Sequence, residues 1–252
     1  EGIGATGLIT YMRTDSLRIS DEAAEQAKIY ITDTYGKEYL PATRRVFKTK
    51  KNAQDAHEAI RPSDPSLTPD RVKKDLTAEQ YKLYKLIWER FIASQMANAL
   101  LDTVAVDIEA ANCLFKASGF TVKFDGFTVL YEESKDTDDE NTASLPPLEA
   151  GNVLTLKELT PNQHFTQPPA RYTEASLIKT LQENGIGRPS TYAPTITTIL
   201  ARGYVERENK SLKPTALGEV TTKLMEEQFA QIVDVTFTAN MQNTLDEVEE
   251  GN

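Results

Sequence analysis

The sequence contains only one cysteine, Cys113, among its 252 residues. A single thiol excludes a disulfide within the chain and a zinc site built from several cysteines. Sparse cysteine is typical of proteins from a reducing compartment, so we expect a cytoplasmic protein in which Cys113 is an ordinary buried thiol on a strand.

Other signatures are missing as well. No apolar run approaches the ~20 residues that span a membrane, and no GxxxxGK[ST] loop predicts ATP binding. The chain starts with Glu1 and shows no charged-then-apolar leader, so we expect an internal piece of a longer soluble protein without a membrane partner. At ~100 to 200 residues per domain, the length predicts two or three domains.

A net charge of −10 argues at first against nucleic acid, because phosphate binding normally needs a basic surface. The charge is unevenly distributed, however. Residues 1–101 carry 16 basic and 14 acidic side chains, residues 102–160 carry 4 and 12, and residues 161–252 carry 8 and 12. Clustered arginines act on phosphates within a Debye length of ~10 Å, so an acidic middle does not exclude nucleic-acid binding elsewhere.

Hydrophobic periodicity predicts a helical first part and a β-rich middle part. In the first hundred residues, Ser20 caps a helix that ends at Gly36, and a capping box of Thr77 and Gln80 starts a longer one. Its apolar stripe comprises Tyr84, Ile87, Trp88, Phe91 and Ile92. The middle alternates and is rich in Val, Thr and Phe, which predicts a β meander with strands at 102–110, 114–117, 120–124 and 127–133, followed by one more at 153–159.

Helical periodicity resumes after Pro168. The predicted elements are a helix at 173–184 closed by Gly185, a helix at 190–203, a hairpin turning at Asn209 and Lys210, and a helix at 215–229. This order is that of a winged helix-turn-helix, which binds DNA. Three helices packed on a hairpin without any nucleic acid fit the same pattern.

The stretch GLITYMRTDS, residues 7–16, is the first candidate for chemistry. As a strand it would place Ile9, Tyr11 and Arg13 on one face. A phenol has a pKa near ~10, so attack at neutral pH needs a nearby cation or base. Arg13 can supply the charge and hold a phosphate oxygen. The pair suits transesterification at a phosphodiester, although a strand tyrosine more often serves packing.

A second cluster is DAHEAIRPSD, residues 55–64, in which His57 and Arg61 are four positions apart and share a face if the segment is helical. Both side chains can donate hydrogen bonds to phosphate, and an imidazole suits proton delivery to a leaving sugar oxygen. A surface histidine paired with Glu58 or Asp55 is the alternative. The acidic residues of this segment do not form a metal site by spacing alone.

A third cluster is GIGRPSTYAPTITT, residues 185–198. Gly185 and Gly187 allow a ligand to approach the backbone, Arg188 stands at a helix start, and Ser190 and Thr191 offer hydroxyls with N–H groups behind them. Such a helix start can cradle phosphate. Serine-capped helix starts without a ligand are equally common.

Several segments together carry a resemblance. GLITYMRTDS, DAHEAIRPSD, KLIWERFIASQM, ELTPNQHFTQPPARYTEASLIKTLQENGIGRPSTYA, RGYVERENKSL and FTANMQNTLDEVE closely resemble the bacterial type IA DNA topoisomerase I family, in order and through nearly the whole chain. The resemblance implies that Tyr11 attacks a phosphate of single-stranded DNA and becomes joined to its 5′ end. It also implies that Arg13 stabilises this phosphate and that His57 lies by the cleavage site. The expected DNA-binding residues are Arg61, Arg188, Ser190, Thr191 and Arg202.

The resemblance further implies a multidomain α and β fold. We expect a mainly helical domain with the tyrosine at 1–97, a β-rich arch at 98–168, and a helical single-strand-binding domain with winged helix-turn-helix character at 169–252. In the family these parts belong to a toroid with a gate. The magnesium ligands lie in a TOPRIM domain that has no counterpart here, so we expect Mg²⁺ in the full-length enzyme and no metal site in these residues.

We therefore expect a monomer that acts on single-stranded or negatively supercoiled DNA as part of a larger enzyme, and that does not relax DNA by itself. One alternative is a winged-helix module that binds DNA without catalysis. Another is a piece of topoisomerase III or reverse gyrase, which share the tyrosine motif. A tyrosine recombinase fits less well, because its arginines surround the nucleophile in a different order along the chain.

Overall fold

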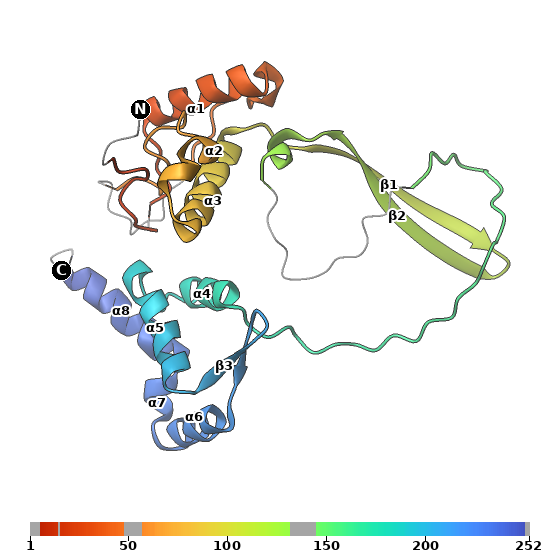
Figure 1. Ribbon diagram of the computed structural model, residues 1–252. Helices are drawn as coiled ribbons and strands as arrows, with labels where there is room; N and C mark the ends of the chain where they lie inside the picture. The colour runs from red at the N-terminus through yellow and green to blue at the C-terminus, as the bar shows by residue number, and fades with distance from the viewer. Residues whose placement is uncertain (1–5, 15, 48–56, 132–144, 250–252) are drawn as a thin grey trace. The chain divides into compact units, whose positions relative to one another are not determined.

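The computed structural model describes residues 6–14, 16–47, 57–131 and 145–249 (Figure 1). Contacts between Cα atoms divide the chain into two compact units, Glu1–Lys157 and Glu158–Asn252, which we describe separately as unit 1 and unit 2. The described residues form helices and two antiparallel two-stranded sheets, so the mixed α and β class is confirmed. The division into three domains and the toroid stay predictions.

The two main helices of unit 1 begin where the sequence predicts. Helix α1 (Asp21–Thr34) starts after Ser20, whose hydroxyl accepts a hydrogen bond from a backbone N–H of the first turn. Helix α3 (Ala78–Gln95) starts with a reciprocal capping box between Thr77 and Gln80. Both caps satisfy N–H groups that a helix cannot satisfy internally, and both predictions are confirmed.

The core of unit 1 lies between α1, α3 and the short helix α2 (Pro69–Val72). The Trp88 indole donates to the carbonyl of Pro65 at 3.0 Å, and the Tyr84 hydroxyl donates to that of Leu67 at 2.6 Å. Tyr84 is only 4% exposed, and burial raises its pKa to about 12. The buried cluster comprises Ala23, Ala27, Ile31, Val72, Tyr84, Trp88, Phe91, Ile92 and Met96.

The β-rich middle is one long hairpin instead of the predicted meander. Strand β1 (Leu100–Ala110) pairs antiparallel with β2 (Cys113–Phe124) along its whole length (Figure 1). The predicted strands at 114–117 and 120–124 are parts of β2, because Ser118 and Gly119 continue the ladder instead of breaking it. Cys113, expected to be buried, is exposed at the start of β2.

The strand predicted at 127–133 is also wrong over its described part. Gly126 has a φ of 52°, and the chain turns there into a single turn of 3-10 helix, Gly126–Val129. Residues 132 and 133 lie outside the described residues. Further turns of 3-10 helix cover Lys37–Tyr39 and Lys73–Asp75.

The segment 153–159 forms no strand either. Its side chains are exposed, with Val153 at 96%, and within the described parts of the chain it pairs with no other segment. Alternation predicts which face a strand would bury, but a strand also requires a neighbour for its backbone groups.

Hydrogen bonds attach the hairpin to the helices of unit 1. The Tyr39 hydroxyl donates to the carboxylate of Asp125 at 2.8 Å. The Ala97 N–H donates to the carbonyl of Tyr39 at 2.7 Å, and the Phe127 N–H donates to that of Ala97 at 3.0 Å. The ends of β1 and β2 are therefore tied to the segment between α1 and α3.

Unit 2 has the predicted order of elements. Its first part comprises α4 (Glu174–Glu183), α5 (Pro189–Ala201), β3 (Val205–Glu208), β4 (Ser211–Pro214) and α6 (Ala216–Gln228). Strands β3 and β4 form a hairpin whose turn contains Asn209 with a φ of 57°. The predicted helix, turn, helix, hairpin and helix are confirmed as elements. Two more helices follow, α7 (Ala230–Val233) and α8 (Val235–Glu249).

Close packing holds α6 against the hairpin. A Cβ placed on Gly218 would lie 2.1 Å from the carbonyl oxygen of Tyr204, so only glycine fits there. Beside it, Leu212 of β4 is buried and donates its N–H to the carbonyl of Tyr172 at 2.7 Å. An isolated bridge between Thr173 and Ser211 adds a third backbone segment beside the hairpin.

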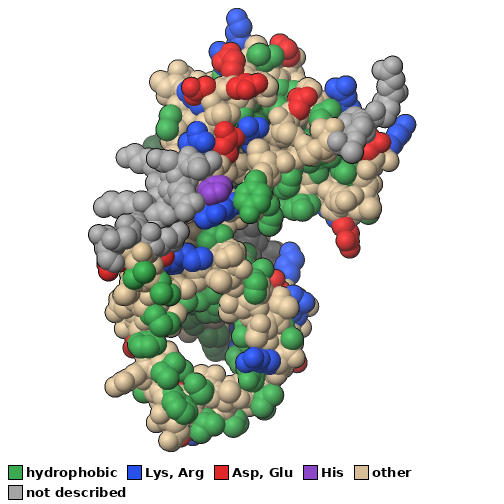
Figure 2. All heavy atoms as spheres, turned by 90° about the vertical axis from the view of Figure 1, so that its left-hand side faces the viewer, with side chains coloured by type: hydrophobic (Ala, Val, Ile, Leu, Met, Phe, Trp, Pro, Cys, Tyr) green, Lys and Arg blue, Asp and Glu red, His purple; other side chains and the backbone are tan. Residues whose placement is uncertain are grey.

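Apolar side chains remain exposed on the last three helices of unit 2. Figure 2 shows hydrophobic side chains on the surface in its lower part. Those of α8 are Val235, Phe237, Met241, Leu245 and Val248. The last four recur every three or four positions, which places them on one face. Within the described residues, no helix combines the length and apolar character needed to cross a membrane.

Candidate active site around Tyr11

The segment that carries Tyr11 is not a strand. It makes one isolated bridge, between Ile9 and Pro62, and is irregular from Tyr11 onward. The prediction that strand geometry aligns Tyr11 with Arg13 is therefore wrong, because the two-residue period requires extended backbone. Tyr11 is 75% exposed, and Arg13 is partly buried.

His57 lies beside Tyr11. The centroids of the two rings are 6.2 Å apart and their planes are tilted by 32°. The predicted proximity is thus confirmed across 46 positions of sequence. The Nδ1 atom of His57 is buried and has no hydrogen-bond partner among the residues that the structure describes. A side chain that can act as a nucleophile therefore lies next to one that can carry a proton.

Backbone hydrogen bonds bring the two sequence motifs together. The Ser63 N–H donates to the carbonyl of Leu8 at 2.9 Å, and the Thr10 N–H donates to that of Arg61 at the same distance. Residues 7–10 and 59–63 therefore run side by side. Because these contacts join the residues just before Tyr11 to the residues just after His57, the approach of Tyr11 to His57 has a backbone cause.

Arg61 is engaged by neighbouring groups. Residues 57–62 are not helical, so the i to i+4 argument for His57 and Arg61 does not apply; Asp55 lies outside the described residues. The guanidinium donates to the Glu58 carboxylate at 2.8 and 3.1 Å and to the Pro62 carbonyl at 3.0 Å. Contact with a phosphate would use its remaining N–H groups, and this role stays a prediction.

In unit 2, Arg188 connects the start of α5 to α8. Its guanidinium lies 2.5 Å from the Asp246 carboxylate and donates to the Gln242 side chain at 3.1 Å. The same Gln242 oxygen accepts the N–H of Gly187 at 2.7 Å. The glycine turn before α5, where Gly185 and Gly187 have φ of 72° and 79°, is therefore fastened to α8.

The other predicted DNA-binding residues lie at the two ends of α5. Ser190 and Thr191 are exposed in the first turn, and the Thr191 hydroxyl accepts the N–H of Arg188 at 2.8 Å. Arg202 is exposed at the C-terminal end. The structure thus assembles Arg188, Ser190 and Thr191 at one helix start and leaves Arg202 at the other end.

Comparison with known proteins decides the family. The sequence matches the DNA topoisomerase family over residues 4–252. The chain belongs to this family. The full-length topoisomerase I of Thermotoga maritima, in a monoclinic crystal form, is 38% identical to it, with a TM-score of 0.77 over 97% of the chain. The chain spans 39% of the length of that protein.

The sequence alone did not identify four residues that organise the cluster around Tyr11 and His57 and the cluster around Arg188. Thr10 and Ser16 use their hydroxyls to bind backbone near His57, and Gln242 and Asp246 hold Arg188. A weak signal existed for the second pair, since positions 242 and 246 share a helix face. None existed for the first, because the hydroxyls bond to residues more than 40 positions away.

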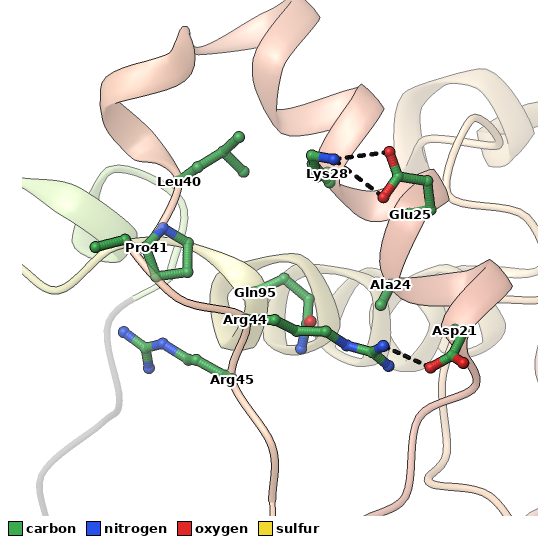
Figure 3. A pocket seen from close by; sticks show the side chains of 10 residues that line it. Asp21, Ala24, Glu25, Lys28, Leu40, Pro41, Arg44, Arg45 and Gln95 are labelled. Carbon is green, nitrogen blue, oxygen red and sulfur yellow. Dashed lines mark hydrogen bonds and ion pairs between the residues drawn. The ribbon is translucent and has the colours of Figure 1, made fainter.

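A cleft elsewhere in unit 1 contains none of the predicted site residues. This cleft of about 320 Å³ lies between α1, the segment 40–45 and Gln95 of α3 (Figure 3). Two of its three cations are paired with acids, Lys28 at 2.8 Å from Glu25 and Arg44 at 2.5 Å from Asp21, and the third, Arg45, donates to the side-chain oxygen of Asn98. We assign it no role in the chemistry.

The described residues of the candidate active site include no cluster of metal-ligating side chains. Within the described ranges, no three side chains of His, Cys, Asp or Glu gather as an ion would require. The magnesium requirement and the location of its ligands outside these residues stay predictions.

Proposed function

We propose that this chain is the nucleophile-bearing part of a bacterial type IA topoisomerase, which cleaves and reseals single-stranded DNA through a 5′-phosphotyrosine. The observation that carries the proposal is the exposed Tyr11 ring 6.2 Å from the His57 ring, within a sequence that matches the DNA topoisomerase family. An exposed phenol can reach a polymer substrate, and an adjacent imidazole can supply acid or base catalysis.

The proposed cleavage step is a transesterification at phosphorus. The Tyr11 hydroxyl gives its proton to water as its oxygen bonds to the phosphorus, and the bond from phosphorus to the 3′ oxygen breaks. The 3′ oxygen takes up a proton that His57 delivers, while Arg13 stabilises the charge on the phosphate. Resealing reverses each step. The linkage keeps the energy of the broken bond, so no nucleotide is consumed.

The single strand is proposed to continue over the start of α5 in unit 2. The hydroxyls of Ser190 and Thr191, the helix N-terminus and Arg188 offer donors that suit phosphate, with Arg202 as a further cation. Arg61 would add a contact near the cleavage site. The net charge of −10 means that these contacts must act locally.

The whole enzyme is proposed to relax negatively supercoiled DNA as a cytoplasmic monomer, with the toroidal gate that its family resemblance implies. Magnesium would be held by a TOPRIM domain outside these 252 residues and would help to place the phosphate. We therefore expect these residues alone to relax no DNA in a gel assay with magnesium. Robust relaxation by this chain would contradict that part of the proposal.

The decisive experiment traps the covalent adduct. Full-length protein is incubated with a labelled single-stranded oligonucleotide, denatured and digested, and mass spectrometry locates the nucleotide. We expect it on Tyr11, with no adduct in Tyr11→Phe and a normal amount in the control Tyr81→Phe. A nucleotide on any other side chain would overturn the proposal.

A DNA-binding module without catalysis is the second candidate. The order of α4, α5, the β3–β4 hairpin and α6 favours it, because a winged helix-turn-helix binds DNA by itself. In that case Tyr11→Phe would leave every DNA-dependent property unchanged. A piece of topoisomerase III or reverse gyrase would give the same adduct, and the domains that flank this region in the full-length protein distinguish those enzymes.

A further inference from the structure

We propose that the hydroxyls of Thr10 and Ser16 are positioning groups for the cleavage reaction. They fasten the two ends of the loop that carries Tyr11 to one stretch of backbone, residues 57–61, which also carries His57. This inference rests on the proposed function of Tyr11 and assigns to two residues a task that the motif alone does not indicate.

The first fastening point directly precedes the nucleophile. The Thr10 hydroxyl donates to the carbonyl of Ala59 at 2.9 Å and accepts the N–H of Arg61 at 3.0 Å. The Thr10 N–H also donates to the carbonyl of Arg61 at 2.9 Å. A longer bond of 3.5 Å from the hydroxyl to the Arg61 carbonyl is the fourth from this residue to the segment opposite. The Cα of Tyr11 is only ~3.8 Å further along the chain.

The second fastening point lies on the other side of the loop. Ser16 is only 4% exposed, and its hydroxyl donates to the carbonyl of His57 at 2.7 Å. It also accepts the N–H of Arg18 at 3.2 Å, and the carbonyl of Arg18 accepts the N–H of Ala59 at 2.8 Å. A buried hydroxyl with both a donor and an acceptor role has little freedom to move.

Both points converge on one peptide stretch. Ala59 accepts from Thr10 through its carbonyl and donates to Arg18 through its N–H, so the two ends of the loop meet at the same residue. His57, two positions earlier, receives the bond from Ser16. The backbone that positions the imidazole is therefore the backbone that closes the tyrosine loop.

Tyr11 depends on these bonds because its own side chain is poorly packed. With 75% of its surface exposed, the ring has few contacts that could fix its position. Its 6.2 Å distance from the His57 ring must then follow from where the backbone lies. A displacement of reacting groups by about 1 Å can slow a reaction by about 100-fold.

The test uses single-turnover cleavage by the full-length protein at saturating oligonucleotide. Thr10→Val and Ser16→Ala remove the hydroxyls, Thr10→Ser keeps one, and Thr32→Val is a matched control. The Thr32 hydroxyl makes a similar 2.8 Å bond to the carbonyl of Lys28, but within α1. The measured quantities are the rate constant of adduct formation, its amplitude and the Kd for DNA.

We expect Thr10→Val and Ser16→Ala to lower the rate constant by about 10-fold or more, with amplitude and Kd within twofold of the wild type. Thr10→Ser should stay within about threefold of the wild-type rate constant, and Thr32→Val should match it. A loss of folded protein would lower the amplitude and leave the rate constant of the remaining enzyme unchanged.

The inference is overturned if wild-type protein forms the adduct on Tyr11 while both hydroxyl-deleted variants cleave at the wild-type rate constant. It is also overturned by a loss of amplitude alone, or by an equal slowing in Thr32→Val. An adduct that persists in Tyr11→Phe is a different result, because it removes the proposed function itself.

Discussion

The guanidinium of Arg188 lies 2.5 Å from the carboxylate of Asp246, so the first turn of α5 is held by a residue of α8, 58 positions later. Both side chains are about two-thirds buried. We expect Asp246→Asn to lower the free energy of unfolding of unit 2 by about 1 kcal/mol, because a partly exposed charged hydrogen bond is lost. Denaturant titration measures this. Glu227→Gln, which breaks an exposed pair with Lys223 in α6, should change stability by less than ~0.5 kcal/mol.

Substitution of Arg188 tests whether this side chain contacts DNA as well as α8. If Arg188 contacts a phosphate, Arg188→Gln should reduce the slope of log Kd against log salt concentration for single-stranded DNA by about 0.7. Lys223→Gln, which removes an exposed cation on α6, should leave the slope unchanged. The measurement is a fluorescence-anisotropy titration with full-length protein at several salt concentrations. An unchanged slope for Arg188→Gln would mean that this side chain serves only the contact with α8.

Removal of the His57 imidazole should slow formation of the covalent adduct on Tyr11. We expect His57→Gln to slow adduct formation by about 100-fold or more, because a glutamine cannot deliver a proton to the leaving oxygen. The Kd for the oligonucleotide should change little. His164→Gln is the matched control, since the other histidine of the chain is exposed and has no assigned role. Equal rates in the two variants would contradict the proton-delivery role.

Replacement of Gly218 by alanine should destabilise unit 2, although this substitution usually stabilises a helix. In a helix, Gly→Ala normally stabilises by about 0.5 to 1 kcal/mol. Here the added Cβ would meet the Tyr204 carbonyl oxygen at 2.1 Å, so α6 would have to move away from the hairpin. We expect Gly218→Ala to destabilise unit 2 by at least ~1 kcal/mol in denaturant titration. A stabilised variant would show that this contact is not as tight as described.

Tyr84 predicts a response to alkaline pH. Burial raises its pKa from 10.0 in the unfolded chain to about 12 in the folded chain. The protonated phenol therefore favours folding fully below pH 10, and this contribution is lost as the pH rises toward 12. We expect the wild type to lose stability over this range more steeply than Tyr84→Phe, as measured by chemical denaturation at a series of pH values. The variant should also lose about 1 kcal/mol at neutral pH, because its bond to the carbonyl of Leu67 is gone. Parallel pH curves would contradict the role of this phenol.

The elements that the sequence predicts correctly are those determined by interactions between residues close together along the chain. The capping box of Thr77 and Gln80 and the turn at Asn209 each lie within a few residues of sequence, and the structure has both elements where the sequence places them. The order of helices and hairpin in unit 2 follows from such signals. Gly119 illustrates their limit, because a glycine predicted to interrupt a strand continues the ladder opposite Val104.

The candidate site depended on contacts that no local pattern contains. The residues around Tyr11 alternate like a strand, yet their hydrogen bonds go to a segment about 50 positions away, partly from backbone groups and partly through the Thr10 hydroxyl. Ser and Thr compete with strand ladders in this way, which turns an apparent strand into an anchored loop. The residue types at the site could be predicted from chemistry and family resemblance, whereas the roles of Thr10 and Ser16 emerge only once distant segments are placed together.

The assignment of Tyr11 and His57 to the same compact unit bears on any hinge bending between the two units. Such bending would leave the spacing of the two rings untouched, since the loop that carries Tyr11 is bonded to the peptide stretch that carries His57. In the proposed reaction, a large movement could then coexist with ångström-scale registration of the reacting groups, and a cleaved strand would be rejoined without rebuilding the site at each cycle.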